Sequence, residues 1–492
     1  MVNIRCSVGV FKSGVRMPRL VSDGGFTLQD AFFFGSGEQV NVQVWESGGG
    51  PMYHPDLPAD DFLLNDGANR LLGTPVIRPG RLFGVDHVGL LIADRYRASP
   101  GAFGVMFDRG FEPVFNGPST RVPRRCCAVF VNAIAAARPA AEFENECYYT
   151  AAHELGHVFN LQHAGRGFMR TSHPSNVYPA TEFQFFSAEM SRLRQCDVDH
   201  TVCPGGSDFY AGVPTNEPAA AGRARPAKSK TPPPLYDPAR GLPKRATPRG
   251  GFSLEINARP DVFFPFEPVE LDVTLRTSSA TPVDVPDQLH PGYERFAVFV
   301  TAPDGSRARY APVVHHCDHG RVATVARNKP HTVDLTLFGQ SGGYTFSRPG
   351  FYQIQALFRI PSGRAIASNV EQVEVRPVAD PKGSAVAETA RRVMTDPGVA
   401  KFLFYRSPGL IGPAERRLEA YVDAHPKYPS IPAAHYALGA CLMRAAEHRP
   451  RAERTRLRKR AHAHLRRAVQ SKGLKGHRCE KAEHLLAVPV AH

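Results

Sequence analysis

Two histidines four residues apart stand near the end of a stretch that is typical of a helix. From Ala140 to Phe159 the chain contains no proline and no cluster of turn residues, and His153 and His157 fall in the second half of this stretch. On a helix, side chains four residues apart project from one face. Two neutral imidazoles placed in this way can bind one zinc ion, so the spacing predicts a metal site.

Two further residues complete the chemistry of this site. Glu154 follows the first histidine directly, where a carboxylate lies beside the metal without binding it and can accept a proton from water that the metal activates. His163, six residues after His157, can provide a third ligand if the helix ends sharply between them. Asn160 stands at that point, and asparagine is second to glycine in adopting the left-handed conformation that ends a helix tightly.

The whole motif reads HELGHVFNLQH and resembles the zinc-binding sequence of the metzincin metallopeptidases, HExxHxxGxxH, with Asn160 in place of the usual glycine. Met169 is similar in position to the methionine of the turn that lies beneath the zinc in that clan. The resemblance covers residues 30 to 210. It implies an α/β catalytic domain that hydrolyses peptide bonds and contains Zn2+, Glu154 as general base, Met169 packed under the metal, and three ligands, His153, His157 and His163.

Upstream segments add to this resemblance. Asp86–Leu91 and Gly104–Phe107 are similar to strands of adamalysin-like metzincins. In that clan the strand before the active-site helix forms the upper rim of the cleft and pairs with an extended substrate. Gly104–Asp108 is therefore the expected rim strand, with an ordinary buried strand as the alternative. The strands expected in this region are Val40–Trp45, His87–Asp94, Gly104–Asp108 and Cys126–Ile134.

Changes in composition divide the chain into four segments. Residues 1–210 contain the zinc motif, and residues 211–250 contain nine prolines and few large apolar residues, which predicts a solvated linker. Residues 251–378 alternate apolar and polar residues between closely spaced turns, which favours an all-β sandwich. The step Pro349-Gly350-Phe351-Tyr352 resembles the tyrosine corner of immunoglobulin-like domains. Residues 382–492 have a helical pattern.

Five helices are expected in the last segment, at 384–395, 411–425, 432–447, 452–469 and 478–487. The stretch Ala434–Ala446 faintly resembles the first helix of a tetratricopeptide hairpin, but no second copy of such a repeat is visible and a helical bundle is the simpler interpretation. The predicted architecture is thus multidomain: a metzincin-like α/β catalytic domain, then an immunoglobulin-like β-sandwich, then an all-α C-terminal domain.

The formal net charge of +14 raises the question of a nucleic-acid partner. Eight Lys and Arg against two acidic residues fall in 211–250, and fourteen against four fall in 441–492, so the remainder of the chain is slightly negative. The basic run Arg454–Arg467 contains no Phe, Tyr or Trp on which bases could stack, and a solvated helix face explains it. The charge distribution therefore argues against nucleic acid as a partner.

Cysteine usage and hydropathy bear on the compartment in which the chain is expected. Nine cysteines, an odd number without a CxxC pair, do not indicate a disulfide framework. The longest mostly apolar run, Cys126–Ala137, is shorter than the roughly 18 residues that a membrane span requires, so no span is expected. No secretory signal is recognised at the start of the sequence. A cytoplasmic location is the default expectation, with non-classical export left open.

Two other groups of residues have simpler interpretations. The cluster His315-His316-Cys317-Asp318-His319 falls between predicted strands without further ligands at metal spacing, and is expected to be a polar loop. Cys6 lacks the motif that surrounds the zinc-blocking thiol of some metzincins and is expected to be structural.

These observations leave two candidate functions. The first is a zinc metalloendopeptidase that acts on a protein or peptide substrate. The alternative is a non-catalytic recognition protein in which zinc only stabilises the first domain, while the sandwich and helical modules bind a protein partner. Glu154 favours the enzyme, because a structural zinc site needs no carboxylate there and is normally closed by a fourth protein ligand.

Overall fold

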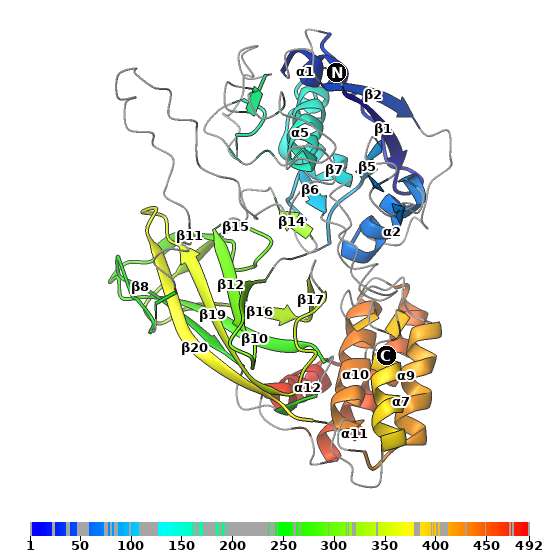
Figure 1. Cartoon of the computed structure of the whole chain (residues 1–492), viewed down its shortest axis with the longest axis vertical. Coiled ribbons are helices and arrows are strands. Elements are labelled where there is room, and N and C mark those ends of the chain that lie inside the picture. The colour runs from blue at the N-terminus through cyan, green and yellow to red at the C-terminus, as the bar shows by residue number, and fades with distance from the viewer. Residues whose placement is uncertain are drawn as a thin grey trace.

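The computed structural model of the 492-residue chain has an N-terminal α/β part, a β-rich part and a helical part (Figure 1). In the N-terminal part the structure describes residues 2–21, 25–35, 40–46, 59–72, 77–78, 81–82, 87–97, 100–107, 126–159, 161, 163, 167–170, 184–185, 189–190 and 193. In the rest of the chain it describes residues 235, 242–243, 245–258, 262–264, 267–293, 295–310, 312, 314–316, 321–340, 343–377, 384–394, 396, 398–399, 402–403, 412–428, 431–447, 449–471, 474 and 477–490. The protein is a mixed, multidomain assembly of helices and sheets, as expected.

A six-stranded sheet forms the centre of the N-terminal part. Strands β2, β1, β5 and β7 run parallel in that order, and β6 joins β7 in the antiparallel direction. The sixth strand, β14 (Val314–His316), comes from later in the chain and pairs antiparallel with β6. The central strands are buried on both faces, as parallel sheets covered by helices usually are. The strands span Val2–Val10 (β1), Val40–Glu46 (β2), His87–Ala93 (β5), Gly104–Phe107 (β6) and Cys126–Phe130 (β7), and a separate hairpin spans Ile77–Arg78 (β3) and Arg81–Leu82 (β4).

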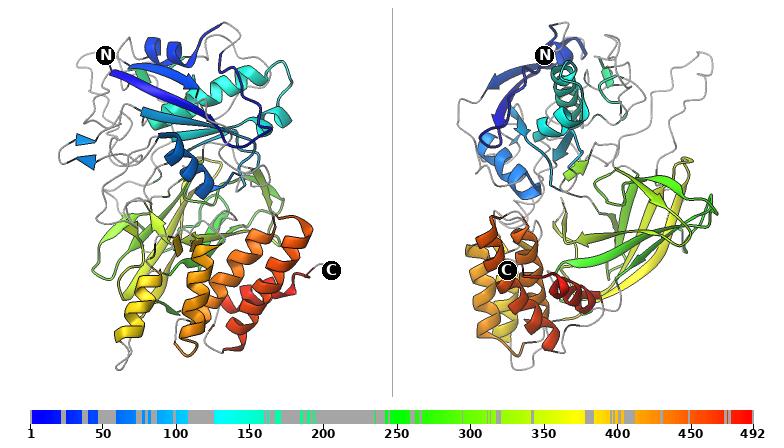
Figure 2. Two further views of the ribbon diagram at one scale, coloured as in Figure 1. Left: turned by 90° about the vertical axis from the view of Figure 1, so that its right-hand side faces the viewer. Right: turned by 180° about the vertical axis from the view of Figure 1, so that it is seen from behind.

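Helices cover this sheet on two sides. Helices α1 (Leu28–Gly35) and α5 (Phe143–Val158) share one apolar core, whereas α2 (Asp61–Leu72) packs into a second core on the other side. Figure 2 shows the sheet with α5 beside it from two further directions. The expected long helix is confirmed, and it places His153 and His157 in its last two turns.

One expected strand is wrong in its second half. The strand predicted over Cys126–Ile134 ends at Phe130, and helix α4 (Val131–Ala137) begins at the next residue. A continuous apolar run does not reveal by itself whether it is strand or helix. Alanine, which supplies most of α4, is the strongest helix former, and this local preference decides the structure after Phe130.

Two facing sheets form the β-rich part. The alternating residues Val269, Leu271 and Val273 pair directly with Leu337, Leu335 and Val333 of the other predicted alternating strand. The two sheets share one apolar core. One sheet contains β8 (Phe252–Asn257), β10 (Val269–Thr277) and β16 (His331–Leu337); the other contains β9 (Val262–Phe263), β12 (Phe296–Thr301), β13 (Arg307–Arg309), β19 (Gly350–Arg359) and β20 (Ala365–Val375). Short pairs add β11 (Val283–Asp287) with β15 (Arg321–Val325), and β17 (Gly339–Gln340) with β18 (Gly343–Tyr344).

The end of the proline-rich segment lies against this β-rich part. The backbone N–H of Thr247 donates to the carbonyl of Ala367 over 3.0 Å, and the Gln355 amide donates to the carbonyl of Pro243 over 2.9 Å. Leu235 and Leu242 pack on apolar side chains of the same sheet. The last residues of the expected linker are therefore part of the folded β-rich unit.

The helical part follows the predicted helices to within about two residues at each end. A hypothetical Cβ on Gly439 of helix α10 (Ile431–Ala446) would lie 2.5 Å from the Leu465 side chain of helix α11 (Arg451–Gln470). Glycine at position 439 therefore allows these two helices to approach closely. Arg460 of the basic run forms ion pairs with Glu415 and Glu419, at 2.5 and 2.9 Å. The helices span Ser384–Met394 (α7), Pro413–Ala424 (α9), Ile431–Ala446 (α10), Arg451–Gln470 (α11) and His477–Ala487 (α12).

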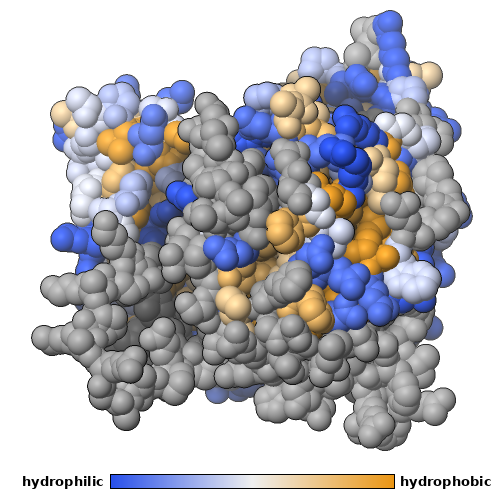
Figure 3. Space-filling view, turned by 90° about the horizontal axis from the view of Figure 1, so that it is seen from above, coloured by the Kyte–Doolittle hydropathy of each residue, from blue (hydrophilic) through white to orange (hydrophobic). Residues whose placement is uncertain are grey.

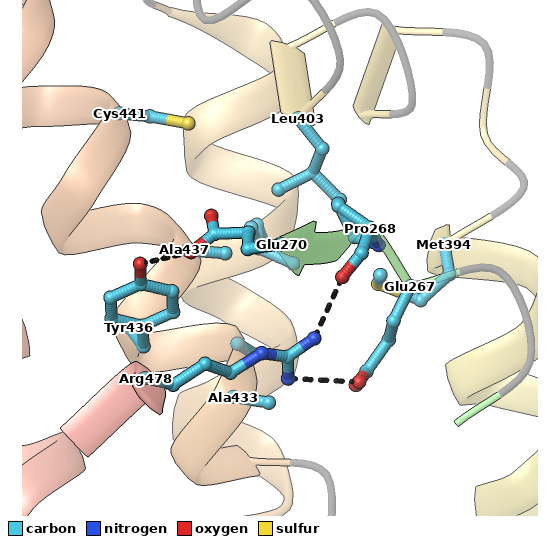
Figure 4. A pocket seen from close by; sticks show the side chains of 12 residues that line it. Glu267, Pro268, Glu270, Met394, Leu403, Ala433, Tyr436, Ala437, Cys441 and Arg478 are labelled. Carbon is cyan, nitrogen blue, oxygen red and sulfur yellow. Dashed lines mark hydrogen bonds and ion pairs between the residues drawn. The ribbon is translucent and has the colours of Figure 1, made fainter. Parts of the chain in front are cut away.

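Buried polar contacts join the helical part to the β-rich part (Figure 4). The Arg478 guanidinium lies 3.2 Å from a Glu267 carboxylate oxygen and donates to the Pro268 carbonyl over 2.8 Å. The Tyr436 hydroxyl donates to the Glu270 carboxylate over 2.5 Å. Burial raises the pKa of Glu267, and the charge of Arg478 opposes that rise. The helical part and the β-rich part therefore stabilise one another through these buried contacts.

The first prediction concerns Arg478. Arg478→Ala should lower the free energy of unfolding by about 3 kcal/mol or more, because it leaves Glu267 buried without its cation. The loss should be smaller near pH 5 than near pH 8, since a protonated Glu267 needs no cationic partner. Urea unfolding of the full chain measures both values. Arg376→Ala removes an exposed ion pair with Glu374 and should change stability by less than about 1 kcal/mol.

A second prediction concerns two buried histidines that face each other. His435 Nδ1 lies 3.0 Å from His464 Nδ1, and His464 Nε2 lies 3.3 Å from Glu419. Burial, with the charges of His464 and Arg467, lowers the pKa of His435 to about 4. The unfolded chain binds a proton at His435 below a pH of about 6.5, while the folded chain stays neutral until about 4. Stability should therefore fall as the pH drops through this interval.

Thermal melting of the full chain at several pH values measures this dependence. His435→Gln keeps a polar side chain there but cannot titrate, so its melting temperature should decrease less between about pH 7 and pH 5 than that of the parent. Equal decreases in both proteins would show that His435 is not the group responsible.

Candidate metal centre

The three motif histidines converge. Their Nε2 atoms lie 3.1 Å apart for His153 and His157, 3.1 Å for His157 and His163, and 3.3 Å for His153 and His163. A tetrahedral zinc ion with bonds of about 2.05 Å would hold nitrogen ligands about 3.3 Å apart. In the described part of the chain these side chains form the one group of His, Cys, Asp or Glu that could hold a metal ion. We call them the histidine triad.

Backbone carbonyls orient two of these rings. His153 Nδ1 lies 2.5 Å from the carbonyl oxygen of Phe168, and His157 Nδ1 lies 2.7 Å from that of Leu161. A carbonyl oxygen only accepts hydrogen bonds, so each Nδ1 carries the proton and donates. Each Nε2 then presents its lone pair to the centre of the triad, which is the arrangement that a metal ligand needs. His153 and His157 are both buried.

The chain turns back immediately after helix α5. The backbone N–H of Leu161 donates to the carbonyl of Gly156 over 3.0 Å, which is the six-to-one bond of a tight helix C-terminus. This turn brings His163 beside the two helical histidines, as the motif predicts. Asn160 lies outside the described residues, so its expected left-handed conformation stays a prediction.

Met169 lies beneath the helix that carries the triad. Its side chain is buried, and a hypothetical Cβ on Gly156 would collide with the Met169 sulfur. The Tyr149 hydroxyl donates to the carbonyl of Gly167, whose φ of 71° lies in the left-handed region. Gly156 and Tyr149 thus hold the Met169 turn against α5. In the sequence, Gly156 inside the motif is the signal for the packing of Met169 against α5, but its role becomes clear only in the structure.

The Glu154 carboxylate is placed by strand β6. Its side chain is 1% exposed, and a Cβ added to Gly104 would lie 2.5 Å from Glu154 Oε1. Only glycine at position 104 leaves room for the carboxylate. Sequence spacing could not predict this contact, because the two residues are far apart in the chain and meet only when β6 joins the sheet.

Other residues expected near the site have different outcomes. Cys6 is buried in β1, where burial raises the pKa of its thiol to about 12. Between residues 187 and 196 the structure describes Glu189, Met190 and Leu193, and all three are helical. The cluster from His315 to His319 was expected in a loop, but His315 and His316 belong to strand β14 (Val314–His316), whose backbone pairs with β6. Cys317, Asp318 and His319 lie outside the described residues.

Few large apolar side chains are exposed on the described N-terminal part. Among the described residues of the N-terminal part, the exposed ones are Phe26, Val44 and Trp45. In the view of Figure 3, hydrophobic patches lie between hydrophilic residues. In the described part of the chain, no helix has the length and hydropathy needed to cross a membrane.

Comparison with known proteins gives no family. No family model matches the chain, and no curated protein matches it. Among solved structures, the sporulation control protein Spo0M from Bacillus subtilis has 13% identity, a TM-score of 0.18, and coverage of 29% of this chain and 56% of its own. OgpA from Akkermansia muciniphila has 13% identity, a TM-score of 0.20, and coverage of 76% and 93%. Fibronectin(III)-like modules of CbhA from Clostridium thermocellum have 18% identity, a TM-score of 0.13, and coverage of 26% and 98%.

A third prediction tests the turn after α5. Asn160→Gly should retain zinc, because glycine adopts the left-handed conformation without strain. Asn160→Val should weaken zinc binding by roughly ten-fold or more, because a β-branched residue disfavours that turn and displaces His163. Competition with a chelator measures both affinities. Equal affinity in the Val variant would show that residue 160 does not set the position of the third ligand.

Proposed function

We propose that this protein is a zinc-dependent endopeptidase with a metzincin-like catalytic domain. One observation carries the proposal: the three Nε2 atoms of the histidine triad point to one centre at zinc spacing, and the Glu154 carboxylate follows on the same helix. The Met169 turn beneath them supports the same assignment, because it matches the resemblance seen in the sequence.

The geometry favours a catalytic site over a purely structural one. Structural zinc sites are normally closed by four protein ligands, whereas catalytic sites use three and keep one position for water or substrate. Among the described residues, the triad brings together three candidate ligands. Zinc that only stabilises the domain, in a protein that recognises a partner through its sandwich and helical modules, is the alternative.

Each group of the site has a role in peptide hydrolysis. Zinc, when bound, supplies a Lewis acid that lowers the pKa of water and polarises the scissile carbonyl. Glu154 accepts the proton of the attacking water and later delivers it to the leaving amine. Glycine at position 104 leaves room for the carboxylate, and the Phe168 and Leu161 carbonyls keep the proton of each helical imidazole on Nδ1. The substrate would be a protein or peptide in extended conformation, paired with the rim strand β6.

The other parts support a recognition role. The Tyr352 hydroxyl donates to the backbone carbonyl of Arg348 over 3.0 Å, a contact typical of the tyrosine corner of immunoglobulin-like sandwiches. We assign the β-rich part to that class and the helical part to a C-terminal helical domain with a tetratricopeptide-like hairpin. Neither contributes a residue to the histidine triad. Binding of a protein partner or of a distant part of the substrate is the function we assign to them.

The fourth prediction separates metal binding from catalysis. Glu154→Gln should retain zinc and lose roughly 100-fold or more of its peptide hydrolysis, because it removes the general base and no ligand. His157→Ala should lose zinc and activity together. Metal analysis and cleavage of a peptide library on the purified full chain measure both properties. Zinc-loaded parent that cleaves no peptide, or a Gln variant as active as the parent, would contradict the proposal.

A further inference from the structure

A short strand from the β-rich part joins the sheet of the N-terminal part. Strand β14 pairs antiparallel with β6, with Val314 opposite Phe107, His315 opposite Met106 and His316 opposite Val105. In Figure 1 β14 lies beside β6, apart from the two large sheets of its own part. In the described part of the chain its ladder partners all belong to β6. We call Val314–His316 the β14 strap.

The strap occupies the edge of the strand that adjoins Glu154. Strand β6 lies between β7 and the strap, so its backbone is paired on both sides. From Val314 to His316 the register advances along β6 toward Gly104, the residue that contacts the Glu154 carboxylate. An extended peptide that added to β6 would need these same backbone groups.

We propose that the β14 strap is an internal competitor of the substrate, and that it holds the enzyme in a low-activity state until it leaves β6. This inference rests on the proposed function, because it assigns a regulator to the same site. The strap mimics a bound peptide in two respects: it is extended, and it runs antiparallel to the edge strand.

The size of the contact suits a reversible device. Three residue pairs hold the strap on β6, and β14 belongs to neither large sheet of the β-rich part. The strap can therefore detach without breaking either of those sheets. With a net gain of about 1 kcal/mol for each ladder hydrogen bond, its removal should strengthen binding of an extended peptide by roughly five-fold or more.

Proline substitutions test the strap through its backbone. Successive residues of an antiparallel pair alternate between bonded and non-bonded positions, so either His315→Pro or His316→Pro removes a ladder N–H. His315→Ala and His316→Ala are the matched controls, because they keep the backbone groups. Each protein is the zinc-loaded full chain.

Two probes separate the edge from the metal. Acetohydroxamate binds metal ions and has no peptide backbone, whereas a tripeptide hydroxamate also presents backbone groups for strand addition. Calorimetry should give equal acetohydroxamate affinities for all five proteins. One proline variant should bind the tripeptide hydroxamate roughly five-fold or more tightly than the parent, with the alanine variants unchanged. Cleavage of labelled casein by that variant should increase through a lower KM.

The outcomes distinguish this inference from the proposed function. Tighter tripeptide binding without any casein cleavage would support the strap as a competitor for β6 and contradict the proposed peptidase activity. Equal tripeptide affinity in parent and proline variants would overturn the strap, and weaker affinity would show that β14 builds the binding edge instead of blocking it. If neither hydroxamate binds any of the five proteins, no metal site is present for the strap to cover, and both proposals fall.

Discussion

Hydrogen bonds from two imidazoles to backbone carbonyls are the constraint on which the site depends. His153 and His157 can present Nε2 to a common centre only if the chain returns to their Nδ1 atoms twice after the helix, at Phe168 and at Leu161. The return at Leu161 requires a sharp helix end, and the return at Phe168 requires a turn that packs under the helix. The helix end, the buried methionine and the position of the third histidine all follow from that requirement.

The sequence was sufficient for the features that local spacing determines. Four-residue spacing placed His153 and His157 on one face, and alternation paired Val269–Val273 with the right partner strand. Contacts between distant segments could not be predicted from the sequence. Gly104, for example, meets Glu154 only through the order of strands in the sheet. The strand assigned to Cys126–Ile134 was wrong after Phe130, because an apolar run that is buried on both faces has no period to read.

Charge counting also had a limit that the structure explains. A solvated face was expected only for the basic run Arg454–Arg467; farther along the chain, Arg478 is 5% exposed and forms an ion pair with Glu267 across the interface with the β-rich part. Arg460 likewise faces the acidic residues of α9. A sum over a segment shows how many charges it has, whereas their role depends on which of them meet an opposite charge in a desolvated place. Of these pairs, Arg460 with its acidic partners joins two helices of the helical part, whereas Arg478 with Glu267 joins the helical part to the β-rich part.

The pairing of β6 with β14 has a consequence for the N-terminal part when it is produced alone. Cutting the chain within the proline-rich segment would remove β14 and leave the outer backbone groups of β6 exposed to solvent. An open strand edge presents unpaired backbone N–H and C=O groups on which another chain can pair. In a truncated form, the same backbone groups of β6 would be open both to a substrate and to a second copy of the fragment. A charged residue at that edge, or a peptide bound along it, would counter this pairing in preparations of the N-terminal part alone.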